Sequence, residues 1–259
     1  MSLLDNITPL LLTYNEEANI DRTLRKLQWA ETVIVVDSGS EDRTKTICGN
    51  YGNVRFIYRK FDCHAKQWNF GLNNTGISTE WVLALDADYV LTEEFIDELK
   101  TLKPSSECGF RSKFKYCVNG KPLSGSLYPP VVTLYRKSKA HYVQDGHTQR
   151  VVVDGRVVDL ESYIYHDDRK SLDKWLMSQN KYAQLECDLL RRKKFAELRW
   201  QDRMRKLIFV TPWLVPIYCI TIGKGFKDGW YGVFYAFQRG IAETILSLKL
   251  LEAKINKVK

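Results

Sequence analysis

The sequence predicts an α/β protein with a mainly parallel central sheet and a helical extension at its C-terminus. Within the first hundred residues, short apolar runs rich in β-branched and aromatic residues alternate with polar stretches of helical length. This alternation is typical of parallel strands joined by crossover helices. After residue 170, apolar residues recur at helical spacing instead. We therefore expect one domain at residues 1–170 and a helical, basic and amphipathic extension at residues 171–259.

Four apolar runs in the first part have the length of strands that are buried on both faces of a sheet. Thr92 precedes Glu93 and Glu94, a pattern that caps a helix and places acidic residues in its first turn. The expected strands are 7–13, 32–37, 54–58 and 81–85, and the expected helices are 17–27, 41–48, 65–72 and 92–102.

The pattern changes after residue 103, where short strands alternate with loops. Strands are expected at 110–118 and 131–135. Further along, Asp154-Gly155 separates two β-forming runs, and an Asp-Gly pair in that position is typical of a hairpin turn. We therefore predict that residues 150–154 and 156–160 pair with each other.

Positive charge is concentrated at the C-terminal end of the chain. Residues 169–259 hold 19 Lys and Arg against 8 Asp and Glu, whereas the other residues hold 20 against 23. A basic segment suits an anionic membrane surface, nucleic acid or a solvated helix face. Nucleic acid is disfavoured because the aromatic residues nearby belong to long apolar runs.

The six cysteines form no CxxC pair and no zinc-ligand spacing, and the N-terminus lacks the pattern of a secretory signal. These features favour reduced thiols in the cytoplasm and argue against a structural zinc site.

Two carboxylates, Asp86 and Asp88, close the fourth expected strand. Alternate residues of a strand face the same side, about 7 Å apart. Their mutual repulsion must be relieved by a cation or by raised pKa values. Oxygen ligands suit Mg²⁺ or Mn²⁺, and such a cation would also stabilise the charge of a departing diphosphate. The alternative is a solvated turn after a strand.

Two other expected strands also end in polar residues. Tyr14 follows the first and could lie against a flat base, and Asp37 ends the second and could accept hydrogen bonds from a base or a ribose. Asn15 as a helix cap and residues 38–40 as a simple loop are the alternatives. Three polar strand ends in one parallel sheet favour a single ligand site.

Together these motifs resemble those of family 2 glycosyltransferases, most closely the bacterial lipopolysaccharide-core glucosyltransferases. The matching segments are residues 13–16 (TYNE), 35–42 (VVDSGSED) and 83–88 (LALDAD). The resemblance is specific over residues 7–100 and extends more loosely to about residue 170. It implies a nucleotide-diphospho-sugar transferase fold, a UDP-sugar donor and sugar transfer with inversion.

The resemblance also implies roles for individual residues. Thr13 begins the first motif, and Tyr14 and Glu16 of that motif would flank the base. Asp37 would hold the uracil or ribose edge, Asp86 the ribose side and Asp88 the metal. Related sequences often carry a Lys or Arg just before the Asn that corresponds to Asn69, where this chain has Trp68. Lys66 is the nearest cation, and it would serve the diphosphate or be an ordinary exposed helix lysine.

Inversion by direct displacement requires a general base that takes the proton of the acceptor hydroxyl. The candidates are Asp145 and, later in the chain, Asp167 or Asp168. In the resembling core transferases a His-Glu pair falls where His147-Thr148 stands, so the Glu has no counterpart. We favour Asp145, which His147 could support, although Asp145-Gly146 could also be an ordinary turn.

His166 has two interpretations. In some relatives a His from this region completes the metal shell, and the resemblance therefore implies that His166 joins Asp88 as a ligand. A lone His is otherwise a hydrogen-bonded structural residue.

The tail contains two apolar segments. Residues 207–222 are uncharged but contain two prolines, and a helix of this length covers about 24 Å of a roughly 30 Å hydrocarbon core. A second segment carries an apolar stripe, and residues 191–194 upstream are all basic. Basic residues beside such segments favour an interfacial helix pair on anionic lipid, whereas burial against the catalytic domain or a second subunit is the alternative. The stripe comprises Trp230, Val233, Phe234, Phe237, Ile241, Ile245, Leu248 and Leu251.

We therefore predict an inverting, Mn²⁺- or Mg²⁺-dependent hexosyltransferase whose catalytic domain spans residues 1–170. Its donor would be a UDP-sugar, and its acceptor a lipid-linked or lipopolysaccharide-type glycan at the inner face of the cytoplasmic membrane. A sugar nucleotidyltransferase is disfavoured because residues 15–20 contain no glycine for a phosphate loop. The intact Asp37, Asp86 and Asp88 argue against an inactive nucleotide-sugar-binding protein.

Overall fold

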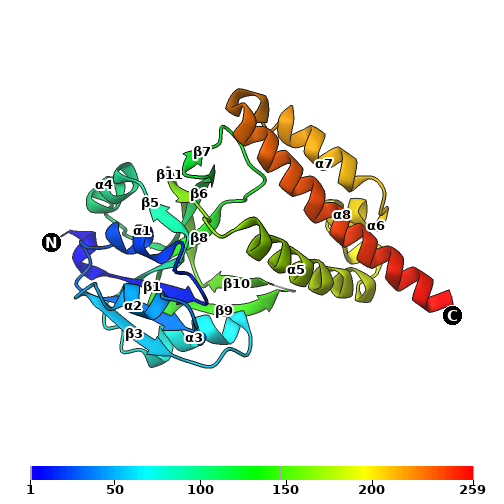
Figure 1. Cartoon of the computed structure of the whole chain (residues 1–259). Helices are drawn as coiled ribbons and strands as arrows, with labels where there is room; N and C mark the ends of the chain where they lie inside the picture. Colours follow the sequence, from blue (N-terminus) through cyan, green and yellow to red (C-terminus); the bar gives the residue numbers. More distant parts are fainter. Residues whose placement is uncertain (1, 146–147, 259) are drawn as a thin grey trace. The chain divides into compact units, whose positions relative to one another are not determined.

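The computed structural model describes residues 2–145 and 148–258, and for residues 145, 148, 257 and 258 it describes the backbone alone. The chain divides into two compact units (Figure 1). One, here called the sheet unit, comprises Met1–Gly120 and Tyr128–Arg169. The other, the helical unit, comprises Lys121–Leu127 and Lys170–Lys259.

The sheet unit contains one large sheet with the strand order β3-β2-β1-β4-β8-β6-β11-β5. Its first four strands in that order are parallel, as the alternating sequence pattern predicts. Their residues are almost entirely buried in β1, β2 and β4, which explains why these runs are continuously apolar. The bounds are β1 Ile7–Thr13, β2 Val33–Asp37, β3 Val54–Tyr58 and β4 Trp81–Asp86.

Helices cover both faces of these strands. Leu11 packs in a cluster with Leu24 of α1 and Phe95 of α4, whereas the neighbouring Leu10 packs with Trp68 and Leu72 of α3 on the other face. The cap predicted at Thr92 is confirmed, because its side chain accepts a hydrogen bond from the amide of Phe95. The bounds are η1 Leu3–Asn6, α1 Ile20–Arg25, α2 Thr44–Cys48, α3 His64–Asn74 and α4 Glu93–Thr101.

The second half of the sheet is mixed. β8 (Val131–Arg136) is antiparallel to both β4 and β6 (Glu107–Val118). β11 (Arg156–His166) is parallel to β6, and β5 (Tyr89–Leu91) is antiparallel to β11. Asp86 ends β4 and Asp88 directly precedes the short β5, and His166 at the end of β11 pairs with Tyr89 of β5.

The predicted hairpin across Asp154-Gly155 is wrong. β10 (Thr148–Val153) pairs instead with β9 (Ala140–Asp145), and these two strands form a separate sheet. Gly155 does turn the chain, with φ of +133°. The turn leads away from β10 because Leu160 and Ile164 of β11 are buried in the core of the large sheet. Burial of these apolar side chains therefore outweighs the local turn signal.

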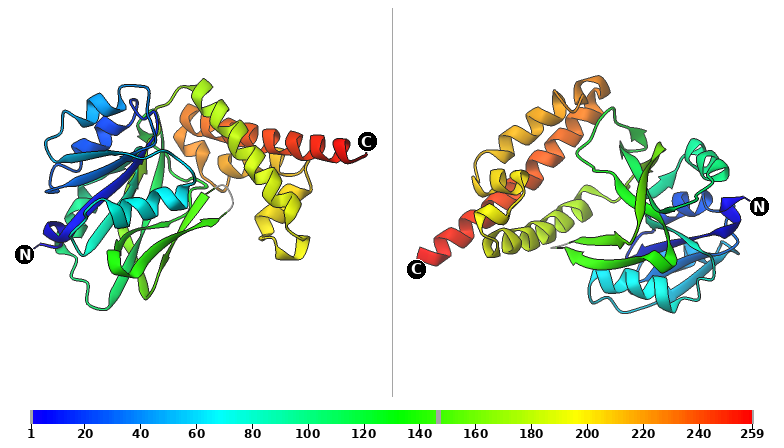
Figure 2. Two further views of the ribbon diagram at one scale, coloured as in Figure 1. Left: turned by 90° about the horizontal axis from the view of Figure 1, so that it is seen from below. Right: turned by 180° about the vertical axis from the view of Figure 1, so that it is seen from behind.

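The helical unit has its own core, formed where α5 and α8 pack together around Cys187, Leu190 and Leu246. Figures 1 and 2 show α7 lying alongside α8. The segment Lys121–Leu127 is attached to the helices by hydrogen bonds. Ser124 bonds to Asp228, and the amide of Leu127 donates to the Tyr235 hydroxyl. The bounds are β7 Lys121–Pro122, α5 Leu172–Arg192, η3 Phe195–Glu197, α6 Trp200–Lys206, α7 Thr211–Ile220, η4 Gly225–Asp228 and α8 Trp230–Val258.

Within residues 2–145 and 148–258, no helix combines the length and the apolar character needed to cross a membrane. All six cysteines are free thiols.

Candidate functional site

The polar strand ends predicted from the sequence meet at one edge of the sheet. In the register of the parallel strands, Thr13 of β1 lies beside Asp37 of β2, and Leu12 lies beside Asp86 of β4. Asp37 in turn lies beside Tyr58, the last residue of β3. Neighbouring strands are about 4.8 Å apart, so these residues form one continuous row.

Asp37 is already saturated by its own surroundings. One carboxylate oxygen accepts hydrogen bonds from the hydroxyls of Thr13 (2.8 Å) and Ser40 (2.6 Å). The other accepts from the amides of Gly39 and Ser40, both at 2.8 Å. A carboxylate offers about four lone-pair positions, and Asp37 is only 3% exposed. Asp37 and Thr13 therefore shape the loop after β2 and leave little capacity for a direct bond to a base or ribose.

The loop after β1 is locked to the loop after β2. The Asn15 amide donates to the Ser40 hydroxyl, and the Asn15 side chain accepts from the amide of Glu41. Asn15 has φ of +55°, a conformation that Asn tolerates better than most residues. Beside this junction Tyr14 is 58% exposed, so its ring is available to a flat ligand. The carboxylate of Glu16 accepts a hydrogen bond from the side chain of Asn19.

Asp88 and His166 come into direct contact. The Nε2 atom of His166 lies 3.1 Å from Oδ2 of Asp88, and both side chains are largely buried. The Asp88 carbonyl accepts from the amide of Asp167, and the Ala87 carbonyl accepts from the buried Thr23 hydroxyl. The loop that carries the two carboxylates is therefore held from both the end of β11 and α1.

The electrostatics of His166 reflect two opposing effects. Burial lowers the pKa of His166, but the nearby carboxylates of Asp88, Asp86 and Asp168 favour the charged form, and the net effect is a pKa above the ordinary value.

An aromatic cage orients the imidazole of His166. Its ring centroid lies 5.4 Å from that of Tyr89, 5.0 Å from Tyr116 and 4.5 Å from Tyr128, each in an edge-on arrangement. The Tyr89 and Tyr128 hydroxyls bond to each other, and burial raises the pKa of both groups. These tyrosines therefore stay neutral. Among the described residues, Nδ1 of His166 has no hydrogen-bond partner.

The donor set at this point fits a divalent cation in part. A carboxylate oxygen of Asp88 and an imidazole nitrogen of His166 face each other, and Asp86 adds negative charge nearby. Within the described residues there is no group of three or more ligating side chains. Mg²⁺ and Mn²⁺ commonly keep several waters and take further ligands from phosphates. Two protein ligands are therefore compatible with a cation that a bound diphosphate completes.

The family model for glycosyl transferase family 2 matches residues 10–199. The chain belongs to this family. It is 27% identical to the lipopolysaccharide core biosynthesis glycosyltransferase LpsC of Rhizobium meliloti, over 89% of each chain. It is also 27% identical to an uncharacterized glycosyltransferase of Rickettsia typhi, over 94% of this chain and 88% of that one.

The fold of this glycosyltransferase is also found in a solved structure. Residues 1–349 of TarS from S. aureus, in complex with UDP-GlcNAc, superpose with a TM-score of 0.51 at 15% sequence identity. The match covers 98% of this chain and 92% of that one. At this identity the likeness concerns the fold alone.

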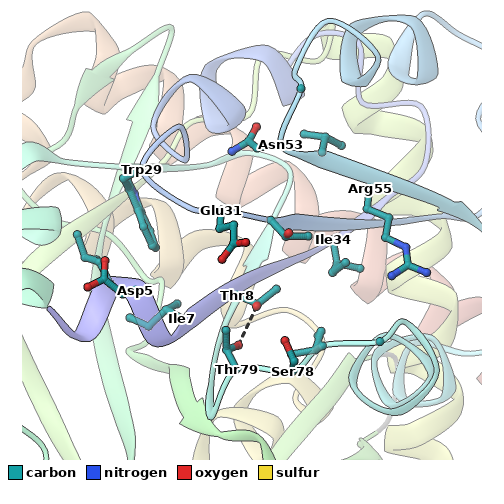
Figure 3. Close-up of a pocket in the computed structure, with 16 residues that line it drawn as sticks. Asp5, Ile7, Thr8, Trp29, Glu31, Ile34, Asn53, Arg55, Ser78 and Thr79 are labelled. Atoms are coloured by element: carbon teal, nitrogen blue, oxygen red, sulfur yellow. Dashed lines mark hydrogen bonds between the residues drawn. The ribbon is translucent and has the colours of Figure 1, made fainter. Parts of the chain in front are cut away.

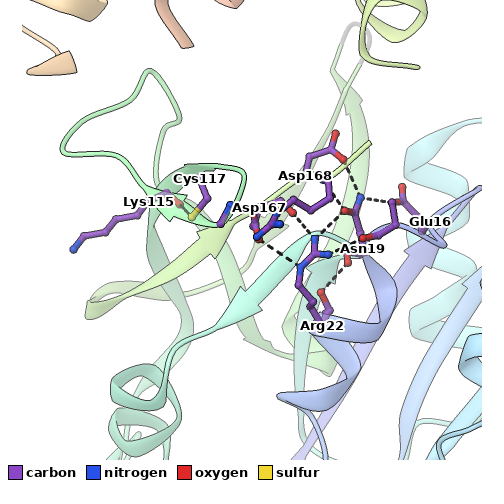
Figure 4. A network of polar contacts seen from close by, with 12 residues as sticks. Glu16, Asn19, Arg22, Lys115, Cys117, Asp167 and Asp168 are labelled. Atoms are coloured by element: carbon purple, nitrogen blue, oxygen red, sulfur yellow. Dashed lines mark hydrogen bonds and ion pairs between the residues drawn. The ribbon is translucent and has the colours of Figure 1, made fainter. Parts of the chain in front are cut away.

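Asp167, the second candidate base of the glycosyltransferase, belongs to a network of polar contacts that joins several parts of the sheet unit (Figure 4). It is 5% exposed, and its carboxylate binds the amide of Gly120 (3.0 Å), Nε of Arg169 (2.7 Å) and Nε of Arg22 (3.4 Å). The oxygens of a carboxylate shared between two guanidinium groups and an amide are occupied by these donors. This environment argues against Asp167 as the base.

Asn19 extends the same network towards the first strand end. It is fully buried, and its amide group donates to Glu16 and Asp168, at 2.9 Å each. Its oxygen accepts from Arg22 and from the amide of Arg169. Figure 4 shows Asn19 between Glu16 and Asp168. The network ties the loop after β1 to the residues that follow β11.

The preferred base, Asp145, ends β9, but its side chain lies outside the described part of the structure, as do Gly146 and His147. β9 itself is anchored to α3. The Asn69 side chain exchanges two hydrogen bonds with the backbone of Tyr142, at 2.8 and 2.9 Å. Trp68 is buried and stacks on the Tyr142 ring, with centroids 5.2 Å apart. Trp68 and Asn69 of α3 therefore anchor β9, and Trp68 has a packing role.

Lys66, the expected diphosphate cation, is 69% exposed and lies 3.5 Å from Asp62. A second cation, Arg59, was not predicted from the sequence. Arg59 follows β3, binds Asp62 and Gln67, and lies over the Phe70 ring. The fully buried Gln67 also donates to the Ser38 hydroxyl. The sequence signal that could have identified Arg59 is its position, because polar residues follow the end of β3 as they follow β1 and β2.

A pocket of about 400 Å³ lies elsewhere in the sheet unit (Figure 3). Its lining includes Ile7 and Thr8 near the start of β1, Ile34 of β2 and Arg55 of β3. These are the opposite ends of the strands from Thr13, Asp37 and Tyr58. None of the predicted site residues lines it, and we assign it no role.

Proposed function

We propose that this glycosyltransferase moves a hexose from a UDP-sugar to a lipid-linked or lipopolysaccharide-type glycan, with inversion of the anomeric configuration. The observation that carries the proposal is the meeting of Asp88 and His166 beside the row formed by the ends of β1, β2 and β4. The resemblance to LpsC supports a lipopolysaccharide-type acceptor. The binding of UDP-GlcNAc by TarS is in keeping with a UDP-sugar donor.

In this proposal the nucleotide lies against the loops after β1 and β2. Tyr14 offers its exposed ring to the base, and Glu16 lies on the same loop. Thr13 and Asp37 act by holding residues 38–40 in place, and Asp86 faces the ribose. Arg59 or Lys66 supplies positive charge near the diphosphate.

Asp88 and His166 hold Mn²⁺ or Mg²⁺, and the tyrosine cage keeps the imidazole turned towards Asp88. A cation held there would supply positive charge that stabilises the departing diphosphate. The acceptor hydroxyl attacks the anomeric carbon from the face opposite UDP, and Asp145 takes the hydroxyl proton. The new glycosidic bond forms as the bond between sugar and diphosphate breaks, and the sugar inverts.

We also propose that the enzyme acts peripherally at the inner face of the cytoplasmic membrane. The helical unit holds 19 Lys and Arg against 8 Asp and Glu, a net charge of +11. Each basic residue near an anionic surface contributes about 1 kcal/mol to attraction. Such attachment would hold the site close to a lipid-linked acceptor.

Product analysis tests the reaction. The full-length protein is incubated with a panel of UDP-sugars, Mn²⁺ and lipopolysaccharide-core acceptors, and the products are separated and characterised by NMR. We expect a glycoside of inverted configuration together with UDP. A nucleotide sugar plus pyrophosphate would reveal a nucleotidyltransferase instead, and a glycoside of retained configuration would exclude direct displacement.

A further inference from the structure

Large apolar side chains of the α7–α8 pair are exposed. Four of them on α8, Trp230, Phe234, Phe237 and Ile241, follow one another at steps of four, three and four, so they share one side of the helix. They are between 41% and 85% exposed. Isolated exposed apolar residues are ordinary, but a contiguous aromatic row marks an interaction surface.

The contacts between the two helices show that α7 extends the same surface. Ser247 of α8 bonds to the carbonyl of Ile208, and Gly240 faces Pro216, so the helices run antiparallel. Pro212 and Pro216 of α7 lie against Gly240 of α8. Trp213 and Ile217 each come one residue after one of these prolines, and Ile241 comes one residue after Gly240. One step turns each helix by about 100°, and in antiparallel helices this step leads to the same side of the pair.

Trp213 and Ile217 are 76% and 59% exposed. We define the outer face as Trp213, Ile217, Trp230, Phe234, Phe237 and Ile241. Three aromatic residues of the outer face belong to α8 and one belongs to α7. Aromatic side chains suit the boundary between water and lipid headgroups better than aliphatic side chains do.

The inner side of α8 carries polar residues beside the apolar Leu246 and Leu250 of the core. Glu243 and Ser247 are buried, and Glu243 binds the guanidinium of Arg205, with a shortest distance of 2.9 Å. Two polar residues of α8 are thus paired inside the unit, while Trp230 and Phe237 are among its most exposed side chains.

Charge at the end of the pair identifies the partner. η4 joins α7 to α8 and presents Phe226, which is 63% exposed, between the exposed Lys224 and Lys227. The unit as a whole carries a net charge of +11. Aromatic residues flanked by lysines suit anionic headgroups above an acyl layer. A protein partner would not require this excess of positive charge.

We infer that the outer face is the part of the enzyme that enters the headgroup region of an anionic membrane, with α7 and α8 lying in its plane. The inference deepens the proposed membrane location and rests on it. Basic residues then supply the salt-sensitive part of the attraction, and the outer face supplies the part that salt does not screen.

Vesicle flotation tests the inference with the full chain, at low and high salt, using phosphatidylcholine vesicles with and without phosphatidylglycerol. The double variant Trp230→Ser/Phe237→Ser removes two outer-face residues. The matched control Leu172→Ser/Met177→Ser removes two exposed apolar residues of α5. The first should lower partitioning at high salt by about 10- to 100-fold, and the control should lower it little. Brominated lipids should quench tryptophan fluorescence of the wild type more than that of the first variant.

The outcomes separate the hypotheses. Equal salt-resistant binding by both variants and the wild type would overturn the lipid-facing role of the outer face while leaving peripheral attachment intact. Absence of the wild type from both vesicle types would overturn attachment as well. Conversion of a wild-type dimer to a monomer in the first variant, seen by analytical ultracentrifugation, would assign the outer face to a second copy. Flotation requires neither donor nor cation, so its result is independent of the proposed reaction.

Discussion

At the scale of single residues, the site carboxylates have different surroundings although the sequence places them in similar patterns. Asp37 bonds to four donors of its own loop region, whereas Asp88 faces the imidazole of His166. Asp167 is divided between an amide and two guanidinium groups. The same side chain thus has a loop-forming role at Asp37, a proposed metal-binding role at Asp88 and a bridging role at Asp167.

Asp88 is expected to be required for metal-dependent nucleotide binding. UDP with Mn²⁺ should raise the melting temperature of the wild type, because a ligand that binds only the folded state stabilises it. Asp88→Ala should abolish this rise, and differential scanning fluorimetry with and without Mn²⁺ measures it. A rise equal to that of the wild type would show that Asp88 is not a ligand.

Asp37→Asn should lower the free energy of unfolding in the absence of any ligand. The substitution sets an amide NH₂ group against the buried donors that the carboxylate now satisfies, at a cost of about 2–4 kcal/mol. Urea denaturation of the ligand-free protein measures the change. If stability is unchanged while UDP binding is lost, the carboxylate contacts the nucleotide directly and the loop-forming role is wrong.

The two candidate bases should respond differently to the same substitution. Asp145→Asn should cut turnover by about 10²- to 10⁴-fold with nearly unchanged UDP affinity, because only proton transfer is affected. Asp167→Asn should instead lower stability, because it weakens the bonds to Arg22 and Arg169. Steady-state kinetics and calorimetry together separate the effects. A folded but inactive Asp167 variant beside an active Asp145 variant would reverse the assignment.

At the scale of elements, the close approach of α7 and α8 requires a glycine at position 240. A Cβ atom added to Gly240 would lie 2.6 Å from Cγ of Pro216, so α7 and α8 would have to move apart. The close approach allows the Ser247 side chain to reach the carbonyl of Ile208 at 2.6 Å. Close packing of this pair also determines that Trp213 and Ile241 share one surface.

Gly240→Ala should therefore destabilise the protein, by about 1–3 kcal/mol. Whether stability falls or rises is informative, because without a clash alanine stabilises a helix interior by about 1 kcal/mol relative to glycine. Chemical denaturation followed by circular dichroism measures the change. Gly52→Ala, where an added Cβ has nothing within 4 Å, is the control. A Gly240 variant as stable as the wild type would mean that the helices are not in this contact.

At the scale of the whole molecule, charge and chemistry are divided between the two units. The helical unit carries +11, and the sheet unit, with 20 Lys and Arg against 23 Asp and Glu, carries −3. The predicted nucleotide and metal residues all belong to the sheet unit, and the outer face belongs to the helical unit. This division predicts that outer-face variants lose most of their salt-resistant vesicle binding. The same variants should keep the rise in melting temperature with UDP and Mn²⁺, which the same fluorimetry measures.

The sequence by itself was sufficient to locate the first four strands, the helices between them and the row of polar strand ends. Apolar periodicity and helix capping are local signals, and the register of parallel strands brings their ends together without further information. Motif resemblance was enough to name the family.

Only the tertiary structure decided which partners these residues have. β10 pairs with β9 because the apolar residues of β11 are buried in the large sheet. Asp167 forms an ion pair with Arg22, 145 residues away in the sequence. Trp68 anchors β9, a strand more than seventy residues later. Glu243 points inwards because Arg205 meets it there. Such partners are set by long-range packing and by the need to pair every buried charge, and neither leaves a local pattern in the sequence.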